Sequence, residues 1–448
     1  MHLQLWKPYS PSQEQPWNIR RVVHLHRRVA FAATWPEIQR DLRDGLGKSI
    51  DRLLNGTAAE TGVPDDFEAL SDRLGESAVR SGCVSRLRAW WLFRTIFTPD
   101  PLTERLTLMW HNHFATSNQK VQNLKFMKQQ NEIFRKYAKA EFGELLPRAV
   151  KSPATLVWLD AQANRKEHPN ENLARELMEL FSLGVGNYSE RDVKEAARAL
   201  TGWTVGSQSR ETSATEGFHF DSSVHDAAEK TIFGKTGRWT GDDLLRLLLG
   251  HPAVSGRLAF RIYELFMGEG TVNDASINEL AAGLRANNLS IAWAVETVLR
   301  SQRFFDDSNI GNRPVAPVEF MVGAVRGLER FDPPPSTLLL AEWAAAMGQD
   351  LFFPPNVFGW PGGRAWLTTR TLVARSNFAH AIVSGETHNP QRTFDVERFA
   401  KRHAASAPDG ITSLLSVLLC GKEIETTSNK DPQRHTAALL SSPDAQLG

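Results

Sequence analysis

The sequence predicts an all-α protein with one minor β-hairpin. Apolar residues recur every three or four positions along most of the 448-residue chain, as one face of a helix requires. Residues that cap or stop helices bound several of these segments. Alternation of apolar and polar residues, the pattern of a strand, occurs near residues 218–234. Together these three observations define the fold class.

The expected helices follow one another along most of the chain. Within residues 36–54, four apolar residues share one face, at Ile38, Leu42, Leu46 and Ile50. The next segment begins at Asp100, an N-cap residue, with Pro101 at the first helical position. Further helices are expected over residues 120–146, 170–183, 242–302, 316–330 and 336–348. Gly184 stops the helix over 170–183, and Ser189 with Asp192 forms a capping box at the start of the helix that follows.

No linker rich in Pro, Gly and Ser interrupts residues 90–380, which favours one large helical domain over residues 18–385. The alternative is two helical lobes joined near residues 206–217, where the sequence is polar. We expect an N-terminal extension over residues 1–17, a C-terminal helical segment over 386–429 and a disordered polar tail over 430–448.

Composition narrows the class of protein. Lys and Arg total 52 and Asp and Glu total 51, so no charge excess points to nucleic acid or to a polybasic membrane surface. Cys83 and Cys420 are the two cysteines, which excludes a disulfide framework and a zinc site built on cysteines. No stretch approaches the roughly 18 apolar residues of a membrane span. Without a signal-peptide pattern at the N-terminus, the default expectation is a cytoplasmic protein.

Four motifs occur in a characteristic order. They are WHNHF at 110–114, PNENLARELMELFSLGVGNYSERDVKEAARALTGW at 169–203, HD at 225–226 followed by KTIFG, and PPNVFGWPGG at 354–363. In this order they resemble the bacterial family called domain of unknown function 1800, over roughly residues 18–380. The chain departs from the family at Ala30 and Ala32, where glycines are usual.

The resemblance implies no settled activity. It implies a possible partner protein, because family members are often encoded beside another uncharacterised family that looks like sulfatases. Many members are exported, so export together with such a partner is a second expectation for localisation.

The WHNHF motif raises the question of a metal site. Residues two apart on a helix point about 200° apart, so His111 and His113 could not bind one ion if both are helical. If the helix ends near His111, an extended segment would place both on one face, and the two become candidate metal ligands. The alternative is a pair of hydrogen-bonded core histidines. We expect His113 to be more buried than His111, because it continues the stripe of Leu106, Met109 and Trp110.

The helix over 170–183 carries the strongest candidate site. Asn172, Glu176 and Glu179 share a face away from its leucine stripe. Two carboxylates on one face could divide acid and base roles, and Glu176 could join His111 and His113 as a metal ligand. Arg175 and Asn172 are candidates for substrate binding. The alternative is a solvated face with ordinary ion pairs, such as Glu171 with Arg175.

Two further motifs are candidates for the same site. His225 and Asp226, with Lys230 close by, fit a general base or a metal ligand. Trp360, within GWPGG, could stack on a substrate or wedge between helices. No Walker loop, GxSxG elbow or HExxH motif is present in the sequence.

These residues predict two alternative functions, and the sequence leaves open whether the chain is an enzyme. The first is a metal-dependent enzyme whose pocket holds a divalent ion such as Zn, Mn or Fe. The alternative is a non-catalytic binding or assembly protein that stabilises the co-encoded partner. An enzyme needs the candidate residues to converge around a cavity, whereas a scaffold would have them scattered or bonded internally.

Overall fold

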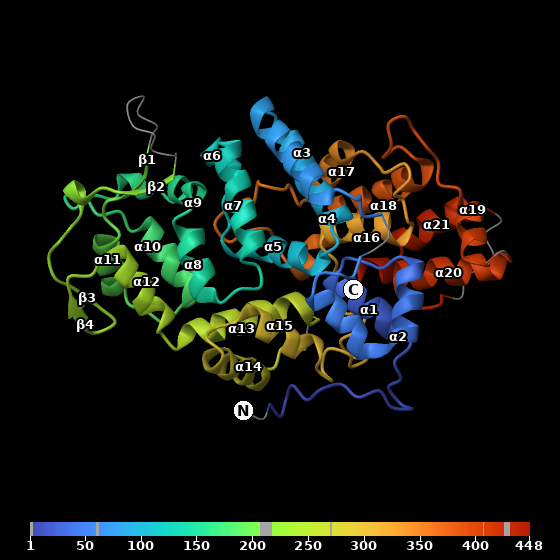
Figure 1. Ribbon diagram of the computed structural model, residues 1–448, viewed down its shortest axis with the longest axis horizontal. Coiled ribbons are helices and arrows are strands. Elements are labelled where there is room, and N and C mark those ends of the chain that lie inside the picture. The colour runs from blue at the N-terminus through green and yellow to red at the C-terminus, as the bar shows by residue number, and fades with distance from the viewer. Residues whose placement is uncertain (1–2, 60–61, 207–216, 269–270, 406, 425–430) are drawn as a thin grey trace.

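The computed structural model describes residues 3–59, 62–206, 217–268, 271–405, 407–424 and 431–448. The fold is mainly helical, as predicted (Figure 1). The first helices are α1 (Ile19–Val29), α2 (Trp35–Leu54), α3 (Phe67–Ser81), α4 (Val84–Phe97), α5 (Pro101–His113), α6 (Asn118–Val121), α7 (Leu124–Lys136), α8 (Phe142–Val150) and α9 (Pro153–Trp158). The long motif forms α10 (Asn172–Glu176), the π-helix η2 (Leu177–Ser182) and α11 (Glu190–Ala199).

Two small antiparallel sheets follow. Strand β1 (Trp203–Gly206) pairs with β2 (Gly217–Phe220), and β3 (Lys230–Ile232) pairs with β4 (Lys235–Gly237). The segment expected to form one hairpin near 218–234 therefore supplies β2 and β3, which pair with different neighbours. The polar stretch considered as a junction between lobes, 206–217, lies largely outside the described residues.

The remaining helices come from the second half of the chain. They are α12 (Gly241–Leu249), α13 (Ala253–Phe266), α14 (Asp274–Ala286), α15 (Ile291–Leu299), α16 (Pro317–Gly327), α17 (Thr337–Ala346), α18 (Thr369–Ser384), α19 (Val396–Arg402), α20 (Pro408–Cys420) and α21 (Pro432–Ser441).

Residues 120–146, expected as one helix, are divided between α6, α7 and α8. Asn123 explains the first break, because its side chain accepts a hydrogen bond from the backbone N–H of Phe126 and caps α7. The expected N-cap at Asp100 and the capping box at Ser189 are both confirmed.

The buried apolar side chains form two clusters. The first cluster joins α5 and α8–α15, with Trp110, Phe142 and Phe181 among its members. The second cluster joins α4 with α16–α21, with Trp91 and Phe378 among its members. In Figure 1, α8–α12 lie at the left and α16–α21 at the right, with α5 between them. Because α4 and α16–α21 come from opposite ends of the chain, the clusters do not correspond to two halves of the sequence.

The expected disordered tail is wrong for residues 431–448. This segment forms α21, which packs on α18 and α20 and buries Ala437, Leu439 and Leu440. Its last residues pair with the strand-like segment before α16, where the backbone N–H of Val315 donates to the carbonyl of Gln446. The tail is polar in composition, and its few apolar residues are buried by partners that are distant in sequence, so local patterning does not reveal the helix.

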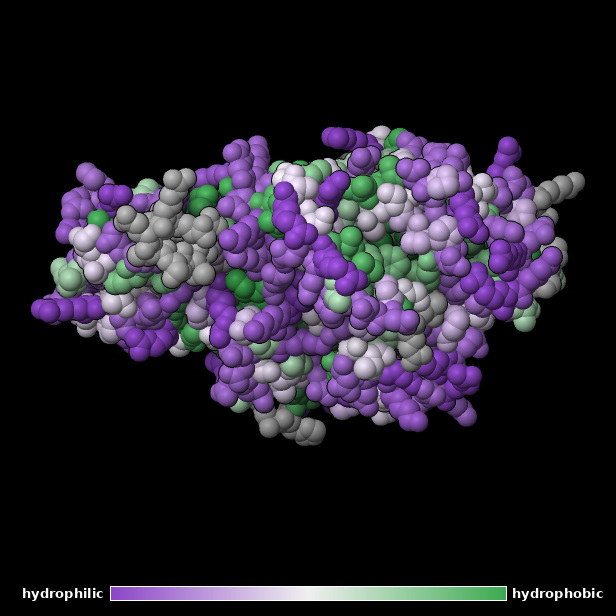
Figure 2. All heavy atoms as spheres, turned by 45° about the horizontal axis from the view of Figure 1, so that its top comes forward, coloured by the Kyte–Doolittle hydropathy of each residue, from purple (hydrophilic) through white to green (hydrophobic). Residues whose placement is uncertain are grey.

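The described helices include none that is both long and apolar enough to cross a membrane. The face of the molecule in Figure 2 is mostly hydrophilic, and hydrophobic side chains appear on it in patches.

Candidate functional site

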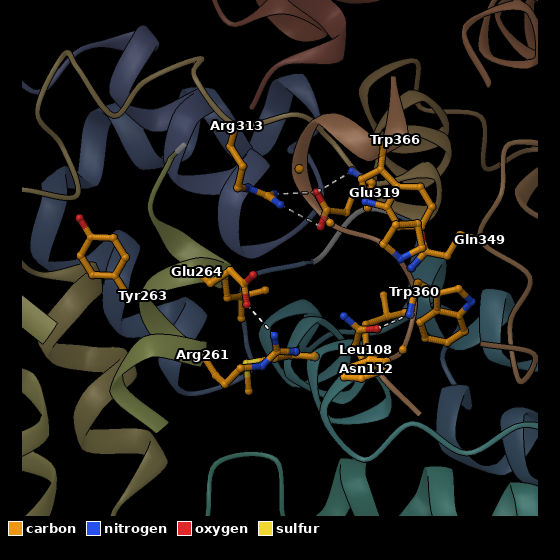
Figure 3. Close-up of a pocket in the computed structure, with 18 of the residues that line it drawn as sticks. Leu108, Asn112, Arg261, Tyr263, Glu264, Arg313, Glu319, Gln349, Trp360 and Trp366 are labelled. Carbon is orange, nitrogen blue, oxygen red and sulfur yellow. Dashed lines mark hydrogen bonds and ion pairs between the residues drawn. The ribbon is translucent and has the colours of Figure 1, made fainter. Parts of the chain in front are cut away.

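A pocket of about 800 Å³ lies where the two clusters meet (Figure 3). One wall comes from α13 of the first cluster and carries Phe260, Arg261 and Glu264. The other comes from the second cluster and includes Glu319 on α16 and the loop that follows α17. Helix α5 forms the floor between them, and its side chains belong to both clusters. A hollow of this size suits a small organic molecule.

Asn112, the central residue of WHNHF, anchors the GWPGG loop to this pocket. Its side-chain Oδ1 accepts a 2.6 Å hydrogen bond from the backbone N–H of Trp360. The contact needs glycine at position 359, where φ is +88° and a Cβ atom would lie 2.1 Å from Asn112 Oδ1. Sequence reasoning missed Asn112 because it weighed only the two histidines beside it.

We predict that Gly359→Ala lowers the free energy of unfolding by about 1–3 kcal/mol, because alanine would be strained at this φ and would collide with Asn112. Gly362 is the matched control in the same loop, since a Cβ there meets nothing within 4 Å. Urea denaturation of both variants checks the prediction. Equal effects of Gly359→Ala and Gly362→Ala would contradict it.

Trp360 is wedged between elements of the core, one of the two roles considered for it, and it also borders the pocket. It is 4% exposed, and its indole Nε1 donates to the carbonyl of Asp350 at 3.1 Å, so the ring is wedged into the second cluster. Its contact with a substrate stays a prediction.

Glu319 lies between two arginines at one end of the pocket. Its Oε1 is 2.6 Å from Arg105 Nη1 and its Oε2 is 2.6 Å from Arg313 Nη2. Burial alone would raise the pKa of Glu319, but the charges of Arg105 and Arg313 outweigh it and hold the pKa at about 2. Burial lowers the pKa of Arg105 to about 10, a shift that the Glu319 carboxylate opposes. Glu319 is therefore a permanently charged counterion at neutral pH.

The opposite wall carries a second ion pair. Arg261 Nη1 donates to Glu264 Oε2 at 2.6 Å, three residues further along α13. Figure 3 shows the Arg261–Glu264 and Arg313–Glu319 pairs on different sides of the hollow, with Asn112 and Trp360 beside it. The site thus offers charged groups, amide side chains and aromatic rings around one volume.

His111 and His113 lie on opposite sides of α5, which is helical through His113. The extended alternative for HNH is therefore wrong, and so is the expected difference in burial: the two residues are 2% and 3% exposed. Both are buried because α5 passes between the two clusters and has core on all sides.

The ring nitrogens of the two histidines have different partners. Asn131 Nδ2 donates to His111 Nε2 at 2.9 Å, since Asn131 Oδ1 already accepts from Arg135. His113 Nε2 donates to the carbonyl of Phe181 at 3.0 Å, because a carbonyl can only accept. Burial lowers the pKa of both histidines well below its usual value, so both are neutral. Neither ring faces a shared ion site.

We predict that His111→Ala and His113→Ala each cost about 2–4 kcal/mol of stability, through lost ring packing and an unpaired buried hydrogen-bonding group. The His111 ring lies 4.3 Å from that of Trp91, and the His113 ring 4.6 Å from that of Phe114. Thermal and urea unfolding check this, with His219→Ala, an exposed position, as the control. If His111→Ala loses as little stability as the control, the prediction that both histidines stabilise the core is wrong.

The carboxylates predicted as catalytic lie on α10 and η2. Burial, followed by the charge of Glu179, raises the pKa of Glu176. Glu179 Oε2 accepts from the Tyr188 hydroxyl at 2.8 Å. Arg175, predicted to bind substrate, pairs with Glu171 and Glu190, and Asn172 Nδ2 donates weakly to Asp160 at 3.4 Å. Catalytic or substrate roles for this face stay predictions.

The π-helix η2 replaces the expected continuous α-helix over 170–183 and contacts both the floor of the pocket, α5, and one of its walls, α13. A π-helix shifts the backbone ladder and redirects carbonyls that an α-helix would bond internally. The carbonyl of Phe181 accepts from His113 on α5, and that of Leu180 accepts from Arg257 Nε on α13 at 3.3 Å. The longest motif therefore supports the pocket without lining it.

His225 and Asp226 attach the loop before β3 to the end of α11. His225 Nδ1 donates to the carbonyl of Thr201 at 2.9 Å, and Asp226 Oδ2 accepts from Arg198 Nε at 2.7 Å. The buried Lys230 ammonium donates to the carbonyls of Asp226 and Ala228. These three residues do not line the pocket. Their hydrogen bonds hold the loop in place.

The structure does not bring the predicted metal ligands together. Within the residues that the structure describes, no group of three or more His, Cys, Asp or Glu could hold a metal ion. His111, His113 and Glu176 each contact different partners.

The protein is mainly helical, and two of its four motifs line a pocket between the two packed clusters. A third motif contacts the floor and one wall of that pocket. The chain belongs to the family described as protein of unknown function (DUF1800), whose model matches residues 24–447. The resemblance inferred from the motifs is thereby confirmed, and it extends through α21. No curated protein and no solved structure matched the chain.

Proposed function

We propose that this chain binds a small organic molecule in the pocket between α5, α13 and the GWPGG loop. The observation that carries the proposal is convergence: two of the motifs that mark the family, WHNHF and GWPGG, meet at this hollow. Its lining combines apolar side chains, such as Met109 and Trp366, with a few charged and amide groups. Such a lining is typical of small-molecule sites.

A neutral fluorescent probe, N-phenyl-1-naphthylamine, tests the proposal. We expect one molecule to bind per chain, with enhanced emission. Gly362→Phe should abolish binding by occupying the pocket, because Gly362 lines the pocket and a Cβ there meets no atom within 4 Å. Gly47→Phe is the matched control, since position 47 on α2 is also exposed and open. No binding to the parent protein, or equal binding to both variants, would refute the proposal.

The metal-dependent enzyme expected from the sequence receives less support. Its ligands would be His111, His113 and Glu176, but the Nε2 atoms of both histidines are already hydrogen-bonded inside the core. Elemental analysis of the purified protein tests it directly. One equivalent of a divalent metal, lost in Glu176→Gln, would restore the enzyme hypothesis.

The second candidate is an assembly protein for the co-encoded sulfatase-like partner. It is supported by the internal bonds of the polar motif residues, since Arg175, His225 and Asp226 all bond within the chain. Co-expression with that partner tests it. A stable complex in gel filtration with a raised melting temperature is expected, and separate elution of the two proteins would count against it.

A further inference from the structure

Several buried guanidinium nitrogens around the pocket have no hydrogen-bond partner within the described residues. Arg105 is 1% exposed, and none of its three guanidinium nitrogens makes a well-directed hydrogen bond within the described residues, although Nη1 is close to Glu319. The buried Nε atoms of Arg313 and Arg261 have no hydrogen-bond partner there either. Buried donors are normally paired. Unpaired Nε atoms also occur in other buried arginines, but among the described arginines Arg105 is the one in which all three guanidinium nitrogens lack such a bond, so its position beside the pocket needs an explanation.

Charge is also unbalanced at the Glu319 end of the pocket. One carboxylate faces two guanidinium groups, those of Arg105 and Arg313. Two more buried arginines lie behind them and bond to neutral acceptors. Arg28 donates to the carbonyls of Phe266 and Asn309 and to Asn312 Oδ1, and Arg375 donates to Gln446 Oε1 and to the carbonyl of Val315.

These positive charges act on one another. Burial and then the charges of Arg313 and Arg105 lower the pKa of Arg28 well below its usual value. Desolvated charges of one sign are costly unless an opposite charge is supplied. Among the described residues that line this end of the pocket, Glu319 is the one that supplies a negative charge, so an anion entering here would relieve the imbalance.

We propose that the pocket takes an organic anion, with its oxyanion group beside Arg313 and its apolar body against Trp360 and Trp366. This inference rests on the proposed function. Arg313 is the group that reaches the ligand, because its side chain is 12% exposed and lines the hollow. Arg105 lies beneath and contributes its charge. Figure 3 shows Arg313 and Glu319 at one side of the hollow and the two tryptophans adjacent, as this orientation requires.

A pair of probes that differ by one sulfonate tests the inference. They are 8-anilinonaphthalene-1-sulfonate, an anion, and the neutral N-phenyl-1-naphthylamine. We expect Arg313→Gln to weaken binding of the anionic probe at least tenfold and to change binding of the neutral probe less than twofold. Arg313→Lys should recover part of the loss, because the charge returns without the planar fork of donors.

Arg300→Gln is the matched control, because it removes the same charge from an ion-paired arginine that does not line the pocket. It should leave the affinities of both probes unchanged. If Gly362→Phe blocks the neutral probe but Arg313→Gln weakens neither probe, or both equally, the anion inference fails while the proposed function stands. If neither probe binds the parent protein, or if Gly362→Phe blocks neither, both fail.

Discussion

Deleting residues 431–448 is expected to lower the melting temperature by more than about 10 °C, or to prevent folding. The segment buries Ala437, Leu439, Leu440 and Ala445 against the second cluster. Burying each leucine contributes about 1.5–3 kcal/mol and each alanine about 0.8 kcal/mol. Their combined loss is comparable to the whole stability of a typical domain, which is about 5–15 kcal/mol. Thermal melting of the full and truncated chains is the measurement.

The deletion also affects the pocket. Gln446 accepts from Arg375, and the backbone of Gly448 pairs with that of Arg313. Without these bonds, Arg375 loses an acceptor in the core and Arg313 loses the backbone pairing that holds it. A truncated chain that melts within about 2 °C of the full chain would show that the tail does not dock.

Two point variants in α21 test whether the stability comes from its buried side chains and not only from the length of the chain. Leu440→Ala, at a position 2% exposed, should cost about 2–5 kcal/mol. Arg434→Ala lies on the same helix with an 81% exposed side chain and should change stability by less than about 0.5 kcal/mol.

The helix ends were predictable because capping chemistry is local. Asp100 accepts from the N–H of Thr103, and Ser189 exchanges bonds with Asp192, as their spacing indicates. Gly184 ends η2 with a φ of +82°, a conformation that glycine adopts without strain. Each of these features depends on residues within four positions of one another.

Burial on both sides of α5 was not predictable from periodicity. The stripe of Leu106, Met109 and Trp110 correctly identifies one core-facing side, but a helix between two clusters has a second. His111 therefore looks solvent-facing in the sequence, yet its ring packs against Trp91 and Phe134. Only the arrangement of α4 and α7 around α5 shows this.

The pocket itself depends on long-range contacts. Arg105 and Glu319 are more than two hundred positions apart in the chain, and neither belongs to one of the four motifs. The sequence shows Trp360 and the WHNHF motif as separate candidates, but their connection through Asn112 requires the fold. Glu176 and His225 became candidates because they are titratable residues within sequence motifs. The excess positive charge at the pocket lies instead on arginines, and no local sequence pattern distinguishes these arginines from others.

Glu319→Ala is expected to cost about 3–5 kcal/mol of stability at pH 7, because it leaves Arg105 buried without its counterion. It also removes the acceptor of Arg313 and the carboxylate that accepts from the N–H of Ala316 at the start of α16. Urea denaturation is the measurement. Glu296→Ala, which removes a half-exposed carboxylate paired with Arg300, is the control and should cost less than about 1 kcal/mol.

The same carboxylate should make stability depend on acid pH. The pKa of Glu319 is about 2 in the folded chain and near its ordinary value of 4.5 when unfolded, so the unfolded state takes up the proton first. The stabilisation is complete above about pH 4.5 and is lost as pH falls towards 2. Between pH 5 and 3, the parent protein should therefore lose more stability than Glu319→Ala. Parallel acid slopes for the two proteins would contradict this prediction, because they would mean that Arg105 and Arg313 do not hold the Glu319 carboxylate charged.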